Sequence, residues 1–489
     1  RPTYMIGIAF NQREFEYDAY TLVKAFYPQE DIEMYCTAEE ETRAYDRLIS
    51  IEYGEKVKIR LKFAGKEQED FLPYDETEDR KTRKNKLKQV LYKLLVQETG
   101  QALPWGNLTG IRPTKIAMGL IESGMSNAQT AEYMRNTYFT SNEKTALAIA
   151  IANRERDILK DIDYEKGYSL YVGIPFCPSI CLYCSFSSSP LERWREKVDS
   201  YLDALLKELD FIAEAMKDRV LDTIYIGGGT PTTLEPYQLT RLLGHIQAKF
   251  PVHQVKEYTI EAGRPDSITR EKLEAIRKFP ITRISVNPQT MNQVTLDIIG
   301  RKHTVEDTRH AFALARECGF DNINMDLIVG LPGEQKEDVR HTLEEVKKLN
   351  PDSLTVHSLA VKRAARLKLF QEQYREMGLE NNQEIMDMTM EYARSCEMSP
   401  YYLYRQKNMC GNLENTGYAK VDKAGIYNIL IMEEKQSILA AGAGASTKYV
   451  FQHGARIERT ENVKDVAGYI SRIDEMIERK RVGIETWLK

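Results

Sequence analysis

The middle of the chain, from about residue 166 to residue 360, alternates short apolar runs with longer stretches of helical periodicity. Apolar runs of four to eight residues bounded by turn residues are typical of buried strands. They predict strands at 169–174, 223–226, 258–261, 283–286, 322–329 and 353–357. Helices are predicted between them at about 192–218, 236–249, 269–278, 304–318 and 335–348.

Six strands that alternate with helices imply a parallel sheet with right-handed crossovers. A partial barrel of six β/α units and an open doubly wound sheet both fit this α/β pattern. In either architecture, the loops at the carboxyl ends of the strands bear the functional groups. The functional residues are therefore expected just after these strands.

The flanking regions have a different pattern. The first 165 residues predict a strand at 4–10, a hairpin of 47–53 and 56–63, and then several helices. Beyond residue 365 the pattern is mostly helical, with helix candidates at 370–397 and 463–481. The sequence thus predicts an α+β N-terminal domain (1–165), an α/β domain (166–365) and a mostly helical C-terminal region (366–489).

The overall composition is that of a globular protein. Hydrophobic residues are 42% of the total, and 68 basic residues nearly balance 73 acidic ones, which gives a net charge of -5. This balance argues against a protein that coats nucleic acid. The chain has no apolar run near the roughly 20 residues of a membrane span, and its first residues lack the pattern of a secretion signal. We expect a cytoplasmic protein with no membrane or nucleic-acid partner.

Three of the seven cysteines, Cys177, Cys181 and Cys184, lie in one short segment after the first strand of the α/β domain. The odd number and the tight C-x3-C-x2-C spacing favour a metal or redox site over a disulfide framework. Iron–sulfur cubanes usually take four thiolates, so three leave one iron open to a ligand. A structural zinc site is the alternative, but the nearest histidines, His245 and His253, lie far along the chain. The segment therefore predicts a [4Fe-4S] cluster with an open iron.

The second motif is rich in glycine and follows the second strand. Gly227, Gly228 and Gly229 precede Thr230 in the sequence IGGGTPT. Glycines let a ligand approach the backbone closely, although such a segment alone is as often only a turn. The spacing is neither that of a P-loop nor that of a dinucleotide-binding fingerprint. The cysteine segment follows the first strand and the glycine segment follows the second strand. The glycine segment is therefore interpreted as the cradle for the amino group of S-adenosylmethionine (SAM).

Together, YVGIPFCPSICLYC at 171–184 and IGGGTPT at 226–232 resemble the radical SAM coproporphyrinogen oxidase family. Within it, the chain is most similar to the HemZ-type coproporphyrinogen dehydrogenases, and LTGIRPTK at 108–115 also resembles that subgroup. The resemblance covers roughly residues 165 to 450. It implies a partial (β/α)6 radical SAM barrel, a [4Fe-4S] cluster, SAM as a cofactor, and an electron donor such as flavodoxin or ferredoxin.

Five further positions match family residues that lie at the cofactor. By this resemblance Tyr171 lies close to the cluster and is the predicted catalytic residue, while the predicted SAM contacts also include Glu261, Gln289, Arg301 and Asp326. A carboxylate can accept hydrogen bonds from ribose hydroxyls, and an arginine can pair with the methionyl carboxylate. The alternative for each position is a surface salt bridge or a cap at a strand end.

Two features depart from the relatives. Bacterial oxygen-independent oxidases have a fourth cysteine two residues after the third, where this chain has Phe186. The related heme chaperones also lack that cysteine, but their heme-ligand motif HNxxYW is absent from this chain as well, which argues against a chaperone.

The resemblance implies oxidative decarboxylation of two propionates of coproporphyrinogen III to vinyl groups, which gives protoporphyrinogen IX in heme biosynthesis. Another radical reaction on a tetrapyrrole, such as methyl transfer or heme ring opening, and heme binding by a chaperone without turnover stay open as alternatives. All three imply a tetrapyrrole as the bound molecule.

A tetrapyrrole with four propionates needs a pocket with cations for the carboxylates and aromatic faces for the ring. Solvated charges beside core aromatic residues are an equally good interpretation of such a set. The candidates are Lys362, Arg363, Arg405 and Lys407, with Tyr402 and Tyr404.

Overall fold

The computed structural model describes residues 5–37, 45–178, 189–359, 380–405 and 413–489. The chain divides into two compact units. Unit 1 comprises residues 1–153 and 403–413, and unit 2 comprises residues 154–402 and 414–489.

Unit 1 has a five-stranded sheet in the order β2-β1-β3-β4-β5. In β4 the side chains of Val57, Ile59, Leu61 and Phe63 are buried and the residues between them are more exposed, as expected for a sheet with one face on a core. The hairpin predicted from the sequence is confirmed as the antiparallel pair of β3 and β4. The strands are β1 (Met5–Phe10), β2 (Asp31–Cys36), β3 (Arg47–Glu52), β4 (Lys56–Phe63) and β5 (Lys66–Pro73).

The helices of the N-terminal part follow the capping signals of the sequence. Asp79 accepts a hydrogen bond from the backbone of Thr82 at the start of α2, and Gly100 ends the helix with a φ of 69°. These helices are α1 (Glu16–Phe26), α2 (Arg80–Thr99), α3 (Thr114–Glu122), α4 (Asn127–Tyr138) and α5 (Asn142–Ile158).

Unit 2 is built on a sheet whose strand order is β14-β15-β13-β12-β11-β10-β9-β6-β16-β17-β18. The six predicted strands are confirmed, and they lie side by side in chain order and parallel to one another. A doubly wound sheet would reverse this order at a switch point. The sheet is therefore a partial barrel. These strands are β6 (Gly167–Ile174), β9 (Val220–Gly228), β10 (Glu257–Gly263), β11 (Arg283–Gln289), β12 (Ile323–Val329) and β13 (Ser353–Ser358).

The barrel stays open because its first and last strands have other neighbours. β6 pairs with β16 (Ser437–Ala441), and β13 pairs with β15 (Asn415–Ala419). The predicted partial (β/α)6 barrel is thus confirmed.

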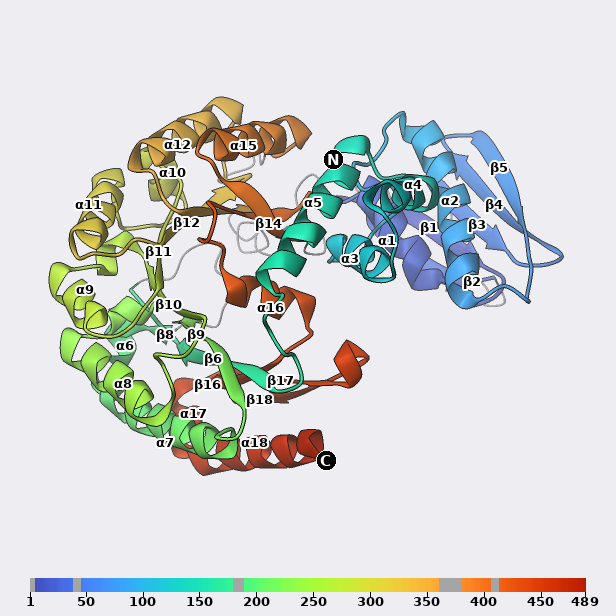
Figure 1. The fold of residues 1–489 in the computed structure, drawn as a ribbon. Helices are drawn as coiled ribbons and strands as arrows, with labels where there is room; N and C mark the ends of the chain where they lie inside the picture. Colours follow the sequence, from blue (N-terminus) through green and yellow to red (C-terminus); the bar gives the residue numbers. More distant parts are fainter. Residues whose placement is uncertain (1–4, 38–44, 179–188, 360–379, 406–412) are drawn as a thin grey trace. The chain divides into compact units, whose positions relative to one another are not determined.

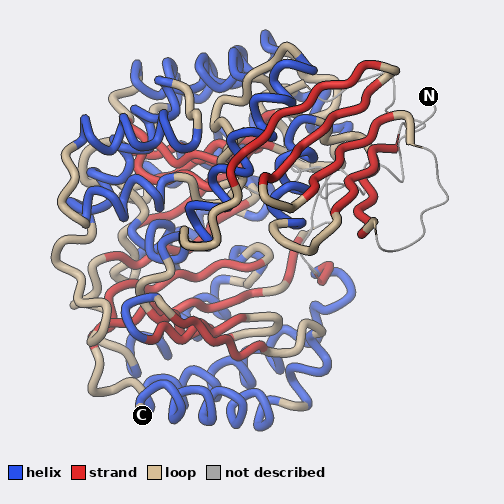
Figure 2. Tube along the Cα trace, turned by 90° about the vertical axis from the view of Figure 1, so that its right-hand side faces the viewer, coloured by secondary structure: helices blue, strands red, loops and turns tan. Residues whose placement is uncertain are grey.

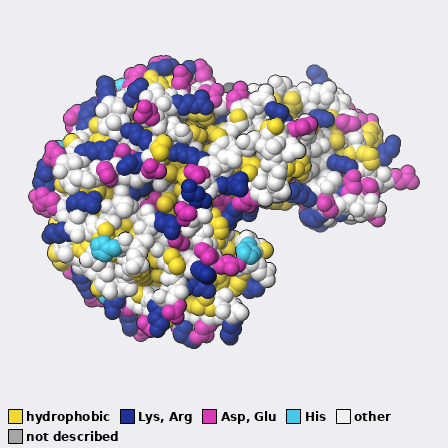
Figure 3. Space-filling view, in the orientation of Figure 1, with side chains coloured by type: hydrophobic (Ala, Val, Ile, Leu, Met, Phe, Trp, Pro, Cys, Tyr) yellow, Lys and Arg dark blue, Asp and Glu magenta, His cyan; other side chains and the backbone are white. Residues whose placement is uncertain are grey.

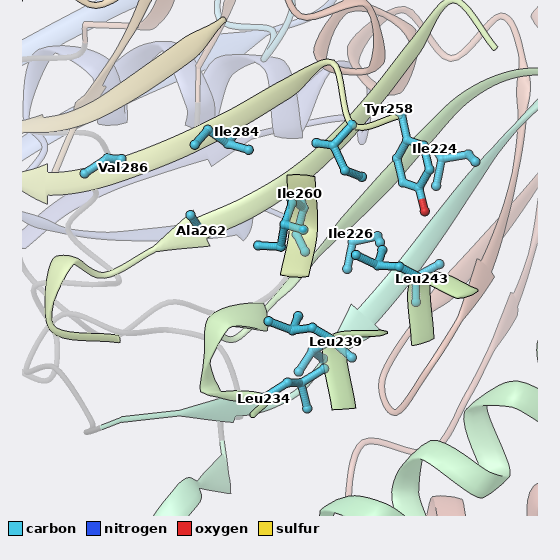
Figure 4. Close-up of a cluster of buried hydrophobic side chains, with 14 of the residues drawn as sticks. Ile224, Ile226, Leu234, Leu239, Leu243, Tyr258, Ile260, Ala262, Ile284 and Val286 are labelled. Carbon is cyan, nitrogen blue, oxygen red and sulfur yellow. The ribbon is translucent and has the colours of Figure 1, made fainter. Parts of the chain in front are cut away.

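Helices cover the outer face of these strands (Figure 1). Apolar side chains decide which face of each strand points outward, toward the helices. Figure 4 shows Ile224 and Ile226 of β9 and Ile260 of β10 on the side of α8, where they pack in the main core cluster with Leu239 and Leu243. Because successive side chains of a strand alternate between faces, the residues between these apolar ones face the inside of the barrel. The covering helices are α7 (Val198–Ala215), α8 (Pro236–Lys249), α9 (Arg270–Arg277), α11 (Val305–Glu317) and α12 (Lys336–Leu349), with the short α6 (Leu191–Trp194) and α10 (Gln293–Ile298) in connecting segments.

The C-terminal region adds helices and also strands, which the sequence pattern did not predict. α15 (Gln383–Ser395), α17 (Val466–Ser471) and α18 (Ile473–Leu488) lie within or near the predicted helical stretches, of which residues 370–379 lie outside the described part. In Figure 2, α18 runs beneath the strands of unit 2 and ends at the mark C. The remaining elements are α16 (Ile426–Glu433), β14 (Ser399–Tyr404), β17 (Ser446–Phe451) and β18 (Arg456–Glu461).

The surface has a mixed charge. On the face shown in Figure 3, basic and acidic side chains are interspersed in both units. Within the described residues, every helix is too short or too polar to cross a lipid bilayer.

Candidate cofactor site at the carboxyl ends of the barrel strands

The segment that contains the three predicted cluster ligands begins and ends at one point of the barrel. After β6, the short strand β7 (Phe176–Cys177) pairs with β8 (Ser189–Pro190), and the backbone N–H of Ser189 donates to the carbonyl of Pro175 at 3.0 Å. Cys177 is nearly buried at this point. Cys181 and Cys184 lie outside the described residues, so the three-cysteine ligand set stays a prediction.

The glycine segment at the end of β9 lies directly against the cysteine loop. The backbone N–H of Gly229 donates to the carbonyl of Ile174, and that of Thr230 donates to the carbonyl of Phe176, both at 2.7 Å. A Cβ on Gly229 would stand 2.6 Å from the oxygen of Phe176 and 3.0 Å from Sγ of Cys177. Gly228 has a φ of 108°, which other residues rarely adopt. The glycines thus bring the two predicted cofactor segments into contact.

Three tyrosine rings stack on the inner side of the strands below these loops. The ring centroids of Tyr171 and Tyr225 lie 6.1 Å apart, those of Tyr225 and Tyr427 lie 4.4 Å apart, and those of Tyr171 and Tyr427 lie 6.4 Å apart. Burial, followed by the charge of Glu261, raises the pKa of Tyr171 above its usual range. Tyr171 is therefore a neutral phenol at the base of the candidate site.

Glu261 lies at the end of β10 beside this stack. Its Oε1 accepts a hydrogen bond from the hydroxyl of Tyr225. Burial, with a further contribution from Asp326, raises the pKa of Glu261 to about 7, although the hydrogen bond from Tyr225 and the charge of Arg283 act in the opposite direction. A carboxyl group in this state can either accept or donate a hydrogen bond near neutral pH.

Asp326 lies on the inner face of β12, on the opposite side of β11 from Glu261. Burial would raise its pKa, but His357, Asn324 and Arg283 together outweigh that effect and lower it. The Nδ2 group of Asn324 donates to Oδ1 of Asp326 at 2.7 Å, and Nε2 of His357 lies 3.7 Å from Oδ2. Asp326 is thus held ionised, in contrast to Glu261.

Between the two carboxylates, β11 offers polar groups that no protein atom satisfies. Within the described residues, Oγ of Ser285, Oδ1 of Asn287 and Oε1 of Gln289 are buried without a hydrogen-bond partner. Gln289 has a φ of 67°, which is strained for a residue with a side chain. Unpaired buried polar atoms are costly, so this row indicates a polar ligand inside the barrel.

Arg301 lies in the segment after α10, next to His303, which interacts with Arg264 just after β10 and with the backbone of Pro288 in β11. Its side chain is buried, and its backbone N–H donates to the carbonyl of Leu296 at 2.9 Å. Its charge, together with burial, lowers the pKa of the neighbouring His303 to about 4.

The described residues suggested for a tetrapyrrole pocket divide between the two units, with Tyr404 and Arg405 in unit 1 and Tyr402 in unit 2. Arg405 belongs to unit 1, where its guanidinium donates to the backbone carbonyls of Leu108 and Gly110. Tyr402 belongs to unit 2 and packs its ring over Gly417. Lys362, Arg363 and Lys407 lie outside the described residues. Arg405 is therefore a buried residue that holds a backbone turn, and it is not the solvated charge that the alternative interpretation expected.

The sequence analysis missed several inner-face residues of the barrel. These are polar or aromatic positions between outward apolar ones, a signal that the two-residue period of each strand already contains. They are Tyr225, Arg283, Ser285, Asn287 and Asn324.

The donor set fits the two groups that the sequence predicts. A cysteine next to a glycine cradle suits an iron–sulfur cluster with SAM on its open iron, and unsatisfied polar atoms with two carboxylates suit the hydroxyl and amino groups of SAM.

Comparison with known proteins agrees with this geometry. Residues 171–346 match the Radical SAM superfamily. The structure of coproporphyrinogen III oxidase (HemN) from Escherichia coli, a radical SAM enzyme, matches with a TM-score of 0.51 and 26% identity over 64% of this chain and 70% of that chain. The fold and site thus define a radical SAM protein, a class that uses a [4Fe-4S] cluster and SAM.

Proteins of similar sequence show which family within the radical SAM class this chain belongs to. Over 409 residues the chain is 42% identical to the oxygen-independent coproporphyrinogen-III oxidase-like protein HemZ of Bacillus subtilis, a match that covers 83% of this chain and 82% of that protein. The heme chaperone HemW of Bacillus subtilis is 37% identical over 40% of this chain and 50% of its own length. The oxygen-independent coproporphyrinogen III oxidase of Salmonella typhimurium is 33% identical over 48% of this chain and 51% of its own length. The chain belongs to the family of oxygen-independent coproporphyrinogen-III oxidase-like radical SAM proteins.

Proposed function

We propose that this protein decarboxylates two propionate side chains of coproporphyrinogen III oxidatively to vinyl groups, which gives protoporphyrinogen IX. The single observation that supports this most is the 42% identity over four-fifths of both chains to a protein named for coproporphyrinogen-III oxidase. The relatives that match less than half of this chain include both an oxidase and a heme chaperone, so a likeness over most of the chain is the more informative one.

In this proposal Cys177, Cys181 and Cys184 hold the [4Fe-4S] cluster, and Gly227, Gly228, Gly229 and Thr230 form the cradle for SAM. When both groups are bound, they supply a 5′-deoxyadenosyl radical that removes a hydrogen atom from a propionate. An electron donor such as flavodoxin or ferredoxin provides the electron that generates the radical. After the hydrogen atom is removed, the propionate loses carbon dioxide and gives one electron to a one-electron oxidant, which leaves the vinyl group.

The chain's own residues bind and orient the cofactor. Glu261, Gln289, Arg301 and Asp326 are the proposed SAM contacts, and the unsatisfied oxygen of Gln289 is available for such a contact. Ionised Asp326 accepts hydroxyl hydrogens, while Glu261 exchanges a proton near neutral pH. Tyr171, the proposed catalytic residue, closes the base of the site with the other two tyrosine rings and excludes water from it.

Two other functions remain as alternatives because the relatives have different names. A further radical reaction on a tetrapyrrole uses the same site with a different product. A heme chaperone corresponds to the HemW relatives, although this chain lacks the motif HNxxYW.

The test is anaerobic incubation of the reconstituted protein with a reductant, SAM and coproporphyrinogen III, followed by mass spectrometry. The proposal predicts vinyl products, carbon dioxide and 5′-deoxyadenosine. Deoxyadenosine without carbon dioxide would indicate another radical reaction, and stable heme binding without deoxyadenosine would indicate a chaperone. The Cys181→Ala variant is the control, and it is expected to lose both the cluster and all SAM cleavage.

A further inference from the structure

The hydroxyl of Tyr225 forms a hydrogen bond with only one of the two carboxylate oxygens of Glu261, which is a proposed SAM contact. Oε1 accepts the hydrogen bond from the phenol of Tyr225. Oε2 lies 3.1 Å from the position that a Cβ on Gly227 would take, and the same position lies 2.7 Å from Cε1 of Tyr225. A side chain at position 227 would therefore crowd Tyr225 and Glu261, and among the described residues Oε2 of Glu261 accepts no hydrogen bond that would compete with a ligand.

Tyr225 is itself held by a helix from the C-terminal region. Its ring stacks on Tyr427 of α16 with an interplanar angle of 17°. The first turn of α16 is fixed by Glu257, whose two oxygens accept the backbone N–H groups of Ile426 at 2.7 Å and Tyr427 at 3.1 Å. Glu257 lies four residues before Glu261 on the same face of β10. One strand therefore anchors α16 and presents Glu261, with the tyrosine stack between them.

The charge of Glu261 depends on every element that faces it. Tyr225 of β9 and Arg283 of β11 favour the ionised carboxylate, and Asp326 of β12 opposes it. Tyr171 of β6 and Tyr427 of α16 are neutral phenols, because burial and the nearby charge of Glu261 both raise their pKa. Among these groups Tyr225 is the hydrogen-bond donor, so its removal shifts the balance toward the protonated acid.

We propose that Tyr225 is a positioning residue that holds Oε1 of Glu261 by its hydrogen bond and favours the ionised carboxylate, so that Oε2, beside Gly227, accepts hydrogen bonds from SAM. The proposal rests on the assignment of Glu261 as a SAM contact. It makes α16, about 165 residues away in the chain from β10, a part of the cofactor site through Tyr427.

The experiment measures SAM binding without reductant and without tetrapyrrole. Equilibrium dialysis of the cluster-loaded protein gives the Kd for SAM between about pH 6 and about pH 9, a range that spans the pKa of Glu261 near 7. The wild type is expected to bind more tightly as pH rises through this pKa. Tyr225→Phe is expected to bind about tenfold more weakly at neutral pH, with its inflection about one pH unit higher, because a hydrogen bond to a charged group has this order of strength. SAM titrates identically with every variant, so only differences between variants are compared.

Two variants serve as controls. Tyr258→Phe removes a buried hydroxyl from the opposite, helix-facing side of β10 (Figure 4), where that hydroxyl has no partner in the described structure, and it is expected to leave the curve unchanged. Glu261→Gln is expected to bind weakly at every pH and to lose the inflection.

The proposal is overturned if Tyr225→Phe gives the same dependence of the Kd for SAM on pH as the wild type. It is also overturned if the variant binds SAM more weakly by the same factor at all pH values, which is what a merely structural role would cause. If that variant fails to fold, an unchanged inflection in Glu261→Gln overturns it instead. A shifted inflection in a protein that makes no vinyl product would refute the proposed reaction alone.

Discussion

At the scale of single residues, Gly229 determines whether the cysteine loop can lie against the proposed SAM cradle. Any Cβ at this position would overlap the carbonyl oxygen of Phe176, at 2.6 Å, and approach the carbonyl carbon of Pro175, at 2.9 Å. Both neighbours are backbone atoms of the segment that leads into Cys177, and backbone cannot move aside as a flexible side chain can. The absence of a side chain at position 229 is thus a requirement of the contact between these two segments.

We therefore expect Gly229→Ala to displace the cysteine loop. The variant should hold several-fold less iron after anaerobic reconstitution and lose SAM cleavage, with a loss of stability of about 1–3 kcal/mol from overpacking. Iron analysis and the visible absorption of the cluster measure the first effect, and denaturant unfolding measures the second.

Gly244→Ala is the matched control. Gly244 lies in α8, and the nearest atom to a new Cβ is Cζ of Phe279 at 4.0 Å. Alanine there should bind iron normally and raise stability by about 0.5–1 kcal/mol, because alanine favours a helix over glycine. Equal iron contents in the two variants would contradict the role of Gly229.

At the scale of elements, the sequence predicts the barrel strands well and the site residues in part. Strands such as β9 and β10 contain apolar residues at every second position, and these predict both the strand and its outer face. The family motifs locate Glu261, Gln289 and Asp326, but the alternation along β9 indicates only that Tyr225 faces inward and does not show what it contacts. Its importance comes from Tyr427, about 200 residues later, and from a contact that no periodicity in the sequence records. The same holds for β16, which pairs with β6 across about 270 residues.

α16 is also held at its other end, by a pair of carboxyl groups. Glu433 in its last turn forms a hydrogen bond with Glu155 of α5, and both side chains are buried. Burial and the charge of Glu433 raise the pKa of Glu155 well above its usual range, although Lys435 acts in the opposite direction. Two carboxyl groups in contact share a proton, so this joint depends on the pair staying partly protonated.

The sign of the pH dependence follows from the raised pKa. A carboxyl group whose pKa is higher in the folded state stabilises the fold fully below its unfolded pKa, and this stabilisation is lost as pH rises through the folded pKa. We expect Glu155→Gln, which stays neutral, to be more stable than the wild type near pH 8, because its neutral side chain has no buried charge to form as the pH rises. The difference should vanish near pH 4, where both proteins are neutral at this position. Unfolding by denaturant at several pH values measures it, and a stability difference that does not change with pH would contradict the shared proton.

At the scale of the whole molecule, the chain leaves unit 2 and returns to it. After Tyr402 the segment 403–413 belongs to unit 1, and at Glu414 the chain re-enters unit 2. Arg405 is the anchor of this excursion: its backbone N–H donates to the carbonyl of Ile111 at 2.6 Å, its guanidinium donates to Gly110 at 2.9 Å, and it lies 5.8 Å from the ring centre of Trp105. The turn that receives Arg405 is part of the LTGIRPTK segment. Unit 1 therefore includes a segment that begins about 250 residues after the end of its main part at residue 153.

This topology predicts that unit 1 cannot be removed by a simple N-terminal deletion. A chain of residues 154–489 keeps Arg405 but loses the carbonyls of Leu108 and Gly110, so a buried cation would lose its partners. We expect that chain to aggregate or to be cleaved by protease near residue 405. β14 ends at Tyr404 and β15 begins at Asn415, and the two strands are neighbours in the sheet, so a short Gly-Ser linker can replace residues 405–413. The truncated chain with this linker should resist protease. It should also keep its iron, because the proposed cluster and SAM residues all lie in unit 2. Limited proteolysis and iron analysis of the two truncated chains test this, and equal resistance in both would show that Arg405 does not anchor the excursion.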